Sequence, residues 1–191
     1  MRVGIFGGTF NPPHFAHLIL AEIIREQAEL DRIRWIPTHT PPHKTAETPA
    51  RHRLAMTRLA IAGNDAFEVS EIELERGGPS YTVDTLEALQ RAEPDVAFSL
   101  LIGGDSLADF MTWRRPDEIV RRAPLIVYRR PGVTASPEAA TRFADRIRYA
   151  DAPAIDLSSQ TIRERVQNGQ SIRYLVPDSV RAYITRHGLY R

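Results

Sequence analysis

The segment from Gly7 to His17 carries the residues best suited to bind an anion. Gly7 and Gly8 let the backbone turn tightly and approach a phosphate group closely, because neither has a side chain. His14 and His17 lie three positions apart, which places both imidazoles on one face of the first turn of a helix. Near the positive end of the helix dipole they can donate hydrogen bonds to one phosphoryl group. The pattern therefore predicts a phosphate site with two histidine donors.

Other interpretations of the histidine pair stay open. The two residues can be ordinary polar side chains at a helix start, or a metal pair. No acidic or histidine partner stands at the spacing of the helical zinc motifs. The segment is not a Walker phosphate loop, because no Gly-Lys-Ser/Thr follows, and it lacks the three spaced glycines of a dinucleotide fingerprint. The glycine turn just before the histidines favours the phosphate site.

Two more segments have the residue types of ligand-binding loops. Gly103 to Ser106 follows the most strand-like run of the chain, Val96 to Ile102. Ser158 to Arg163 places two hydroxyl side chains at the start of a helix that carries an arginine. Ligands of open α/β sheets bind at the carboxyl ends of the strands, where helix N-termini favour anions. We expect both segments to meet Gly7 to His17 at that edge of a sheet.

The elements that must position these segments alternate between strands and helices. Arg2 to Phe6 predicts a buried strand, Pro13 to Leu30 an amphipathic helix and Ile33 to Pro37 a parallel second strand. This alternation indicates an α/β fold, a Rossmann-like parallel sheet with helices on both faces. Further expectations are a helix from Pro49 to about Gly63, strands at 67–70 and 125–128, helices opening near Ser80, at 136–138 and at 158–159, and helix stops at Gly169 and Gly188.

Length and composition favour one domain. With 191 residues, 42% of them hydrophobic, the chain can bury one core, so we expect a single domain over 1–191 with 160–191 as a small C-terminal helical subdomain. A formal net charge of +1 gives no global field for nucleic acid or anionic lipid. The lack of cysteine excludes disulfides, thiolate metal sites and thiol catalysis. Without a signal-peptide core or an apolar run of about 20 residues, a cytoplasmic protein is expected, with no membrane partner.

Lys44 stands out because the other 24 basic residues are all arginine. The bias can reflect coding preference alone. If arginine replaces lysine wherever the two are equivalent, however, the remaining lysine marks a place that needs a compact point charge. Both interpretations stay open on composition.

The glycine turn and the histidines belong to a longer pattern, Gly7-Gly8-Thr9-Phe10-Asn11-Pro12-Pro13-His14-x-x-His17. It resembles the signature of nucleotidyltransferases that share a His-x-Gly-His motif with class I aminoacyl-tRNA synthetases, and among them the bacterial nicotinate-nucleotide adenylyltransferase family. Further matching motifs follow in order along nearly the whole chain: Pro41-Pro42-His43-Lys44, Arg76 to Leu86, Ile102 to Leu107 with Trp113, Arg130-Pro131-Gly132, Ser158-Ser159 with Ile162-Arg163, Tyr174 to Pro177 and Gly188-Leu189-Tyr190. The resemblance rests on the set of motifs.

The resemblance implies adenylyl transfer from ATP to nicotinate mononucleotide, giving nicotinate adenine dinucleotide and pyrophosphate, with Mg²⁺ carried by ATP and no dedicated protein ligands for the metal. His14 and His17 would hold the α-phosphate, Arg163 the leaving pyrophosphate, and Lys44 a phosphate; these are the implied catalytic residues. The attacking phosphate has a second pKa of about 6, so it is largely ionised at neutral pH and no general base is required.

The resemblance also implies two sets of binding residues. Trp113 would be the platform for the nicotinate ring, and the backbone N–H groups of Tyr81 and Thr82, with Ser80 as a helix cap, would bind its carboxylate. Asp105 would lie at the ribose, with helix capping as the alternative role. The ATP set is Gly7, Gly8, Thr9, Phe10, His14, His17, Gly103, Asp105, Ser158, Ser159 and Arg163; the nicotinate mononucleotide set is Thr9, Phe10, Lys44, Tyr81, Thr82, Asp105, Trp113 and Arg130.

Two positions depart from the family pattern. Ala16 stands where the family has glycine between the histidines, and Gln160 stands where a threonine is usual, with Thr161 after it. The alternatives that keep the chemistry are nicotinamide mononucleotide or phosphopantetheine as acceptor. A non-catalytic nucleotide-binding regulator and an activity on tRNA are alternatives from other classes, and no pattern specifies an oligomeric state. Balanced charge argues against tRNA as a partner.

Overall fold

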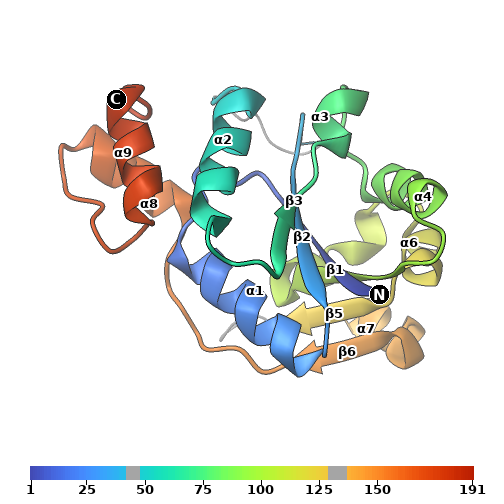
Figure 1. Ribbon diagram of the computed structural model, residues 1–191. Helices are drawn as coiled ribbons and strands as arrows, with labels where there is room; N and C mark the ends of the chain where they lie inside the picture. The colour runs from blue at the N-terminus through green and yellow to red at the C-terminus, as the bar shows by residue number, and fades with distance from the viewer. Residues whose placement is uncertain (42–47, 129–136) are drawn as a thin grey trace.

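The computed structural model describes residues 1–41, 48–128 and 137–191. Its sheet has six parallel strands in the order β3-β2-β1-β4-β5-β6 (Figure 1). The strands are β1 Arg2–Gly8, β2 Arg32–Pro37, β3 Phe67–Val69, β4 Ala97–Gly103, β5 Leu125–Tyr128 and β6 Ile147–Ala150. The predicted parallel α/β sheet is confirmed. Lys44 and Arg130 lie outside the described residues, as do most of the motifs around them.

The order of the strands reverses between β1 and β4. The chain adds β2 and β3 on one side of β1, and then β4, β5 and β6 on the other. Such a reversal leaves a crevice at the carboxyl ends of the two central strands, which is where ligands bind in sheets of this kind. Gly8 ends β1 and Gly103 ends β4, so two of the three predicted ligand-binding segments leave the sheet at this crevice.

Helices cover both faces of the sheet, as predicted. Ile5 of β1 belongs to one buried cluster and its neighbour Phe6 to the other, because successive side chains of a strand point to opposite faces. Figure 1 shows α1 and α2 on the face of Phe6 and α4 and α6 on the face of Ile5. The α-helices are α1 Phe15–Gln27, α2 Ala50–Ile61, α3 Ile72–Arg76, α4 Thr82–Ala92, α5 Gly104–Ala108, α6 Pro116–Arg122, α7 Pro137–Arg142, α8 Ser159–Gln167 and α9 Asp178–Arg186.

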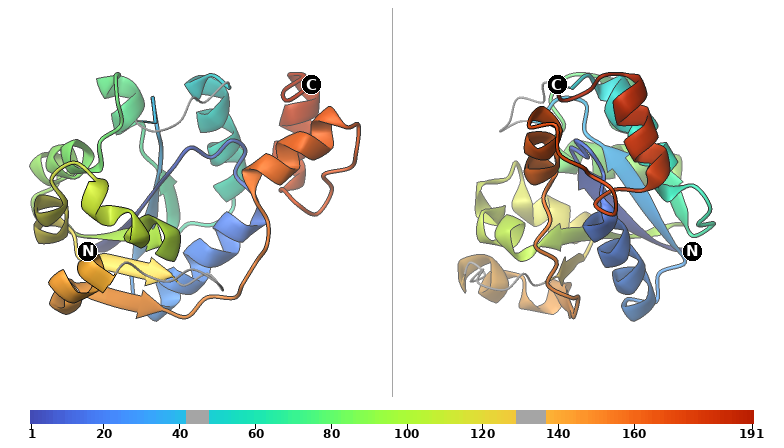
Figure 2. Two further views of the ribbon diagram at one scale, coloured as in Figure 1. Left: turned by 180° about the vertical axis from the view of Figure 1, so that it is seen from behind. Right: turned by 90° about the vertical axis from the view of Figure 1, so that its left-hand side faces the viewer.

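The last two helices lie to one side of the sheet, beyond α2. A segment without helix or strand, residues 151–158, leads from β6 past α1 to α8 (Figure 2). Ile162 of α8 and Val180 and Ile184 of α9 join the buried cluster on the α1 and α2 face. Glycines with positive φ follow both helices, at Gly169 and Gly188, as predicted.

Both predicted ends of the first helix are wrong, and one predicted ligand-binding segment does not leave the sheet directly. Helix α1 begins at Phe15 and not at Pro13, because His14 has the extended backbone of an N-cap residue. It ends at Gln27, before Glu29 takes a positive φ of 53°. Ser158 does not follow the last strand directly, since β6 ends eight residues earlier at Ala150.

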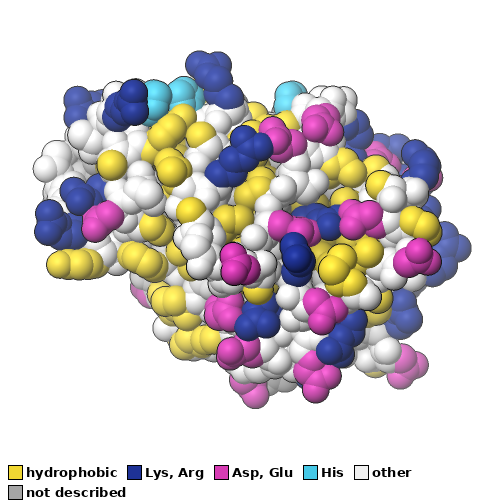
Figure 3. Space-filling model, in the orientation of Figure 1, with side chains coloured by type: hydrophobic (Ala, Val, Ile, Leu, Met, Phe, Trp, Pro, Cys, Tyr) yellow, Lys and Arg dark blue, Asp and Glu magenta, His cyan; other side chains and the backbone are white. Residues whose placement is uncertain are grey.

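The surface carries both signs of charge. On the face seen in Figure 3, arginine side chains alternate with aspartate and glutamate, in line with the formal net charge of +1. Within the part of the chain that the structure describes, no helix combines the length and the apolar character that crossing a membrane requires.

Candidate active site

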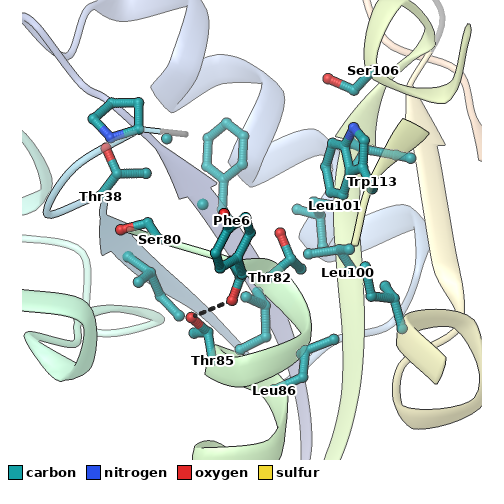
Figure 4. Close-up of a pocket in the computed structure, with 18 of the residues that line it drawn as sticks. Phe6, Thr38, Ser80, Thr82, Thr85, Leu86, Leu100, Leu101, Ser106 and Trp113 are labelled. Carbon is teal, nitrogen blue, oxygen red and sulfur yellow. Dashed lines mark hydrogen bonds between the residues drawn. The ribbon is translucent and has the colours of Figure 1, made fainter. Parts of the chain in front are cut away.

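A cavity of about 840 Å³ opens at the carboxyl ends of β1 and β4. This volume is in the range of small-molecule sites. In Figure 4, Thr38 and Ser80 lie on one side of it, Trp113 and Ser106 on the other, with Phe6 between them. Predicted site residues among those that line it are Gly7, Gly8, Thr9, Tyr81, Thr82, Gly103, Asp105 and Trp113. The cavity therefore brings together segments that are about 100 residues apart in the chain.

The turn after β1 is built on a buried ring. A Cβ atom at Gly8 would lie 2.9 Å from the ring of Phe10, so only glycine fits there without a shift. Phe10 has a positive φ of 47° and is buried against Phe6 and His17, with ring centroids 5.6 and 5.3 Å away. Phe10 is not among the residues that line the cavity, although the resemblance implies a contact with both substrates. The Phe10 ring therefore packs edge-to-face against the His17 ring.

The two histidines are stacked on each other at the start of α1. Their ring centroids are 3.7 Å apart, and the His14 amide donates a hydrogen bond to Nδ1 of His17 at 3.2 Å. Because Nδ1 of His17 accepts this bond, the neutral ring carries its proton on Nε2. His14 is 3% exposed and His17 is half-buried, so His17 is the more accessible donor.

Asp105 lies at the mouth of the cavity. A Cβ atom at Gly103 would be only 2.3 Å from Oδ1 of Asp105, so the carboxylate folds back over the glycine that ends β4. The N-cap of α5 is Gly103, and Asp105 follows within the first turn. Asp105 is therefore not the N-cap residue of this helix, and it is an exposed residue of the cavity lining.

The start of α4 and Trp113 form the opposite part of the wall. Tyr81 is the N-cap of α4, so the prediction that a helix begins at Tyr81 and Thr82 is confirmed. Ser80 is not its cap, because the Ser80 hydroxyl accepts a hydrogen bond from the His39 amide at 2.9 Å. Trp113 is half-buried, with its ring 5.2 Å from that of Phe110. Its exposed part is therefore available as a platform.

Residues of α8 reach the turn that contains the histidines. Arg163 donates to the Asn11 carbonyl at 2.9 Å, and Ser159 donates to the Pro12 carbonyl at 2.8 Å. Ser158 caps α8 by accepting a hydrogen bond from the Thr161 amide at 3.0 Å. Ser158 is therefore the N-cap of α8, whereas Ser159, the other serine predicted to cap it, is not. These α8 residues, like His14 and His17, lie beside the cavity and not on its lining.

Tyr190 is a further contact to the same turn that sequence reasoning did not assign. Its hydroxyl donates to Oδ1 of Asn11 at 2.7 Å. Burial raises the pKa of Tyr190, so the phenol keeps the proton that it donates. Together with Arg163 and Ser159, Tyr190 ties the C-terminal helices to the residues just before His14.

The tyrosine contact leads to a test of stability. Tyr190→Phe is expected to lower the free energy of unfolding by about 1 kcal/mol, because a buried amide oxygen loses its donor. Chemical denaturation measures this value. Tyr174→Phe is the matched control, since Tyr174 is 81% exposed, and it is expected to change stability by less than about 0.5 kcal/mol. Equal effects of the two variants would show that the Asn11 contact does not stabilise the turn.

Arg53 of α2 is the second residue that sequence reasoning did not assign. The side chain is 1% exposed, and burial lowers the pKa of its guanidinium. It donates to three backbone carbonyls, those of Thr48 at 3.1 Å, Thr9 at 3.0 Å and His39 at 2.9 Å. One buried guanidinium therefore connects helix α2 to the glycine turn and to the chain that follows β2.

Comparison with known proteins places the chain in a family. A family model described as cytidylyltransferase-like matches residues 5–165. A Salinibacter ruber protein named "Probable nicotinate-nucleotide adenylyltransferase" is 54% identical, over 100% of this chain and 98% of that protein. The chain belongs to the nicotinate-nucleotide adenylyltransferase family. A Bacillus pumilus protein of the same name is 43% identical, over 99% of this chain and 98% of that protein.

Solved structures share the fold of this family member. The nicotinic acid mononucleotide adenylyltransferase of Plasmodium falciparum, complexed with NaAD, superposes with a TM-score of 0.83 over 99% of this chain and 97% of that one. A putative nicotinate-nucleotide adenylyltransferase of Vibrio parahaemolyticus gives 0.71, over 100% and 95%. Each is 20% identical to this chain, so these matches concern the fold.

The two departures from the family pattern lie in different surroundings. Ala16 is 3% exposed, so its methyl group is covered by protein. The Gln160 side chain donates to Oε1 of Glu164 at 2.9 Å on the surface of α8. The hydroxyl of Thr161 lies 2.9 Å from that of Ser158, which keeps a threonine hydroxyl at the cap of α8 although it is shifted by one residue.

Proposed function

We propose that the chain transfers the adenylyl group of ATP to nicotinate mononucleotide, a step of NAD biosynthesis. The observation that supports this most is the cavity at the strand reversal, where the glycine turn, the start of α4 and Trp113 converge in a member of this family. The glycine turn suits a phosphate, and the helix start and the indole suit an aromatic carboxylate. We also propose that residues 1–191 act as one nucleotidyltransferase unit, with 160–191 as its helical tail.

The reaction joins two phosphates. A phosphate oxygen of nicotinate mononucleotide attacks the α-phosphorus of ATP, a new P–O bond forms, and the bond to the bridging oxygen breaks as pyrophosphate leaves. The attacking oxygen is already ionised at neutral pH, so catalysis consists of positioning and of stabilising charge. In this proposal Nε2 of His17 donates to the α-phosphate, and His14, whose ring stacks on that of His17, shares the contact as the resemblance implies.

Arg163 takes the leaving group in this proposal. A guanidinium has five N–H donors, so its contact with the Asn11 carbonyl leaves others for pyrophosphate. Mg²⁺ is proposed to arrive with ATP, because this ion is usually held by substrate phosphates and one or two carboxylates. Asp105 offers an exposed carboxylate at the cavity mouth, and no group of three or more metal-binding side chains occurs among the described residues. When bound, the ion neutralises phosphate charge. We also propose that Lys44 contacts a phosphate and that Arg130 binds nicotinate mononucleotide, as the resemblance implies.

Pyrophosphate release with ATP, Mg²⁺ and one acceptor at a time tests the proposal. Nicotinate mononucleotide is expected to give the highest kcat/KM, ahead of nicotinamide mononucleotide, and phosphopantetheine is expected to give none. Equal or faster turnover of nicotinamide mononucleotide would overturn the acceptor assignment. ATP binding without turnover of any acceptor would instead support a non-catalytic regulator.

A further inference from the structure

Arg114 is a positively charged side chain that lines the cavity. Among the lining residues that the structure describes, it is the one lysine or arginine, whereas Glu73, Asp105 and Asp109 contribute carboxylates. A substrate with several negative charges does not gain from a lining that is acidic on balance. Arg114 therefore has a strong influence on which group of an anionic ligand lies near this part of the described lining.

The guanidinium of Arg114 lies over the start of α4. Its central carbon is 4.7 Å from the centroid of the Tyr81 ring, and Tyr81 is the N-cap of this helix. The N-terminus of an 11-residue helix carries partial positive charge from its free N–H groups. A cation and a helix N-terminus repel each other weakly, so an anion that binds between them is stabilised by both.

The acidic neighbour of Arg114 is mainly paired elsewhere. Asp84, in the first turn of α4, accepts a hydrogen bond from Arg115 at 2.6 Å through Oδ1, whereas Arg114 reaches its Oδ2 at 3.5 Å. The Arg114 side chain is 52% exposed. A long contact of this kind between exposed groups contributes little, about 0–1 kcal/mol, so Arg114 can turn to another carboxylate at small cost.

We propose that the Arg114 guanidinium binds the carboxylate of the nicotinate ring and thereby determines the preference of the enzyme for the acid over the amide. Trp113, the preceding residue, lines the same cavity and is the proposed ring platform, so the charged group follows the ring contact directly in the chain. The inference rests on the proposed function, because it assigns one residue to the acceptor of that reaction.

The chemistry of the two acceptors explains why a side chain is needed. Backbone N–H groups at Tyr81 and Thr82 can donate to a carboxylate oxygen or to the oxygen of a carboxamide, so they discriminate weakly. A guanidinium has donors only. It forms two charge-assisted hydrogen bonds with a carboxylate, whereas a carboxamide offers it one neutral oxygen and leaves the second donor facing the NH₂ group. Arg114 is a specificity residue on this argument, and it takes no part in forming or breaking a bond.

The experiment compares kcat/KM for nicotinate and nicotinamide mononucleotide in wild type and three variants. Arg114→Gln is expected to lower the value for the nicotinate substrate about tenfold, mainly through KM, because a charged hydrogen bond contributes roughly the 1.4 kcal/mol that equals a factor of ten. The value for the nicotinamide substrate is expected to stay within about twofold. Arg114→Lys, which keeps the charge without the planar fork, is expected to lie between wild type and Arg114→Gln.

Arg121→Gln is the matched control. It removes the same charge from helix α6, where the side chain is 76% exposed and does not line the cavity, and both substrates are expected to be unaffected. An unchanged ratio of the two kcat/KM values in Arg114→Gln, whether both fall or neither does, would overturn the inference. Failure of the wild-type protein to turn over nicotinate mononucleotide would overturn the proposed function instead, so the two failures are distinguishable.

Discussion

His17→Ala is expected to lower kcat by about 100- to 1000-fold while the protein stays folded. Removing one donor that acts on charge developing in a transition state has an effect of this size. The structure points to Nε2 as the donor, because Nδ1 of His17 already accepts a hydrogen bond from the His14 amide at 3.2 Å. The measurement is single-turnover formation of the dinucleotide with saturating ATP and nicotinate mononucleotide.

His17→Asn separates the two functions of the ring. An asparagine side chain places an amide oxygen near the position of Nδ1, so it can accept the bond from the His14 amide, but it does not extend to the position of Nε2. We expect His17→Asn to recover any stability lost in His17→Ala, measured as the free energy of unfolding, and to remain as inactive. Turnover within about tenfold of wild type in either variant would refute the assignment of His17 to the α-phosphate.

Elements with a strong local pattern were predictable from the sequence. β1 and β5 are short runs of hydrophobic residues with other residue types on either side. Their hydrophobic residues are buried. β6 was not predicted, because Ile147–Ala150 is an edge strand whose two middle side chains, Arg148 and Tyr149, are exposed. An edge strand that packs only its ends lacks the continuous apolar run of a buried parallel strand. Short helices such as α5 were missed because fewer than two turns give no periodicity.

The site was predictable where its chemistry is local. Gly8 and the two histidines are close in sequence, and their pattern alone predicts a phosphate turn. Tyr190 and Asn11, by contrast, are 179 residues apart and meet only because the C-terminal helices pack beside α1 and α2. Among 24 arginines, nothing local distinguishes Arg114, whose role depends on its position over Tyr81.

Arg53 did leave a signal in the sequence. It shares one face of α2 with Met56, Thr57 and Ala60, three, four and seven residues further on, all of which are buried. An arginine within a buried helical stripe needs acceptors nearby, because a buried charge without hydrogen bonds is strongly unfavourable. The structure supplies them as carbonyl groups, which the sequence does not indicate, since every residue has one.

Arg53→Met is expected to lower the free energy of unfolding by about 3–5 kcal/mol, although methionine fills much of the space of the arginine stem. Three carbonyl oxygens, of Thr48, Thr9 and His39, lose their donor, and each unsatisfied buried acceptor costs about 1–3 kcal/mol. Urea denaturation measures the difference. Because Thr9 belongs to the glycine turn, kcat is also expected to fall at a temperature where the variant remains folded.

Arg58→Met on the same helix is the control for Arg53→Met. The Arg58 side chain is 56% exposed and pairs with Glu71 at the surface, and such pairs contribute about 0–1 kcal/mol. Arg53→Met is therefore expected to lower the free energy of unfolding at least three times as much as Arg58→Met, although the two residues are only about one and a half helical turns apart. If Arg53→Met lowered the free energy of unfolding as little as Arg58→Met, the carbonyls would have found other donors. The glycine turn would then be held by the contacts of Arg163, Ser159 and Tyr190 without Arg53. A large loss at Arg53 alone would show that a residue outside every motif holds the glycine turn in place.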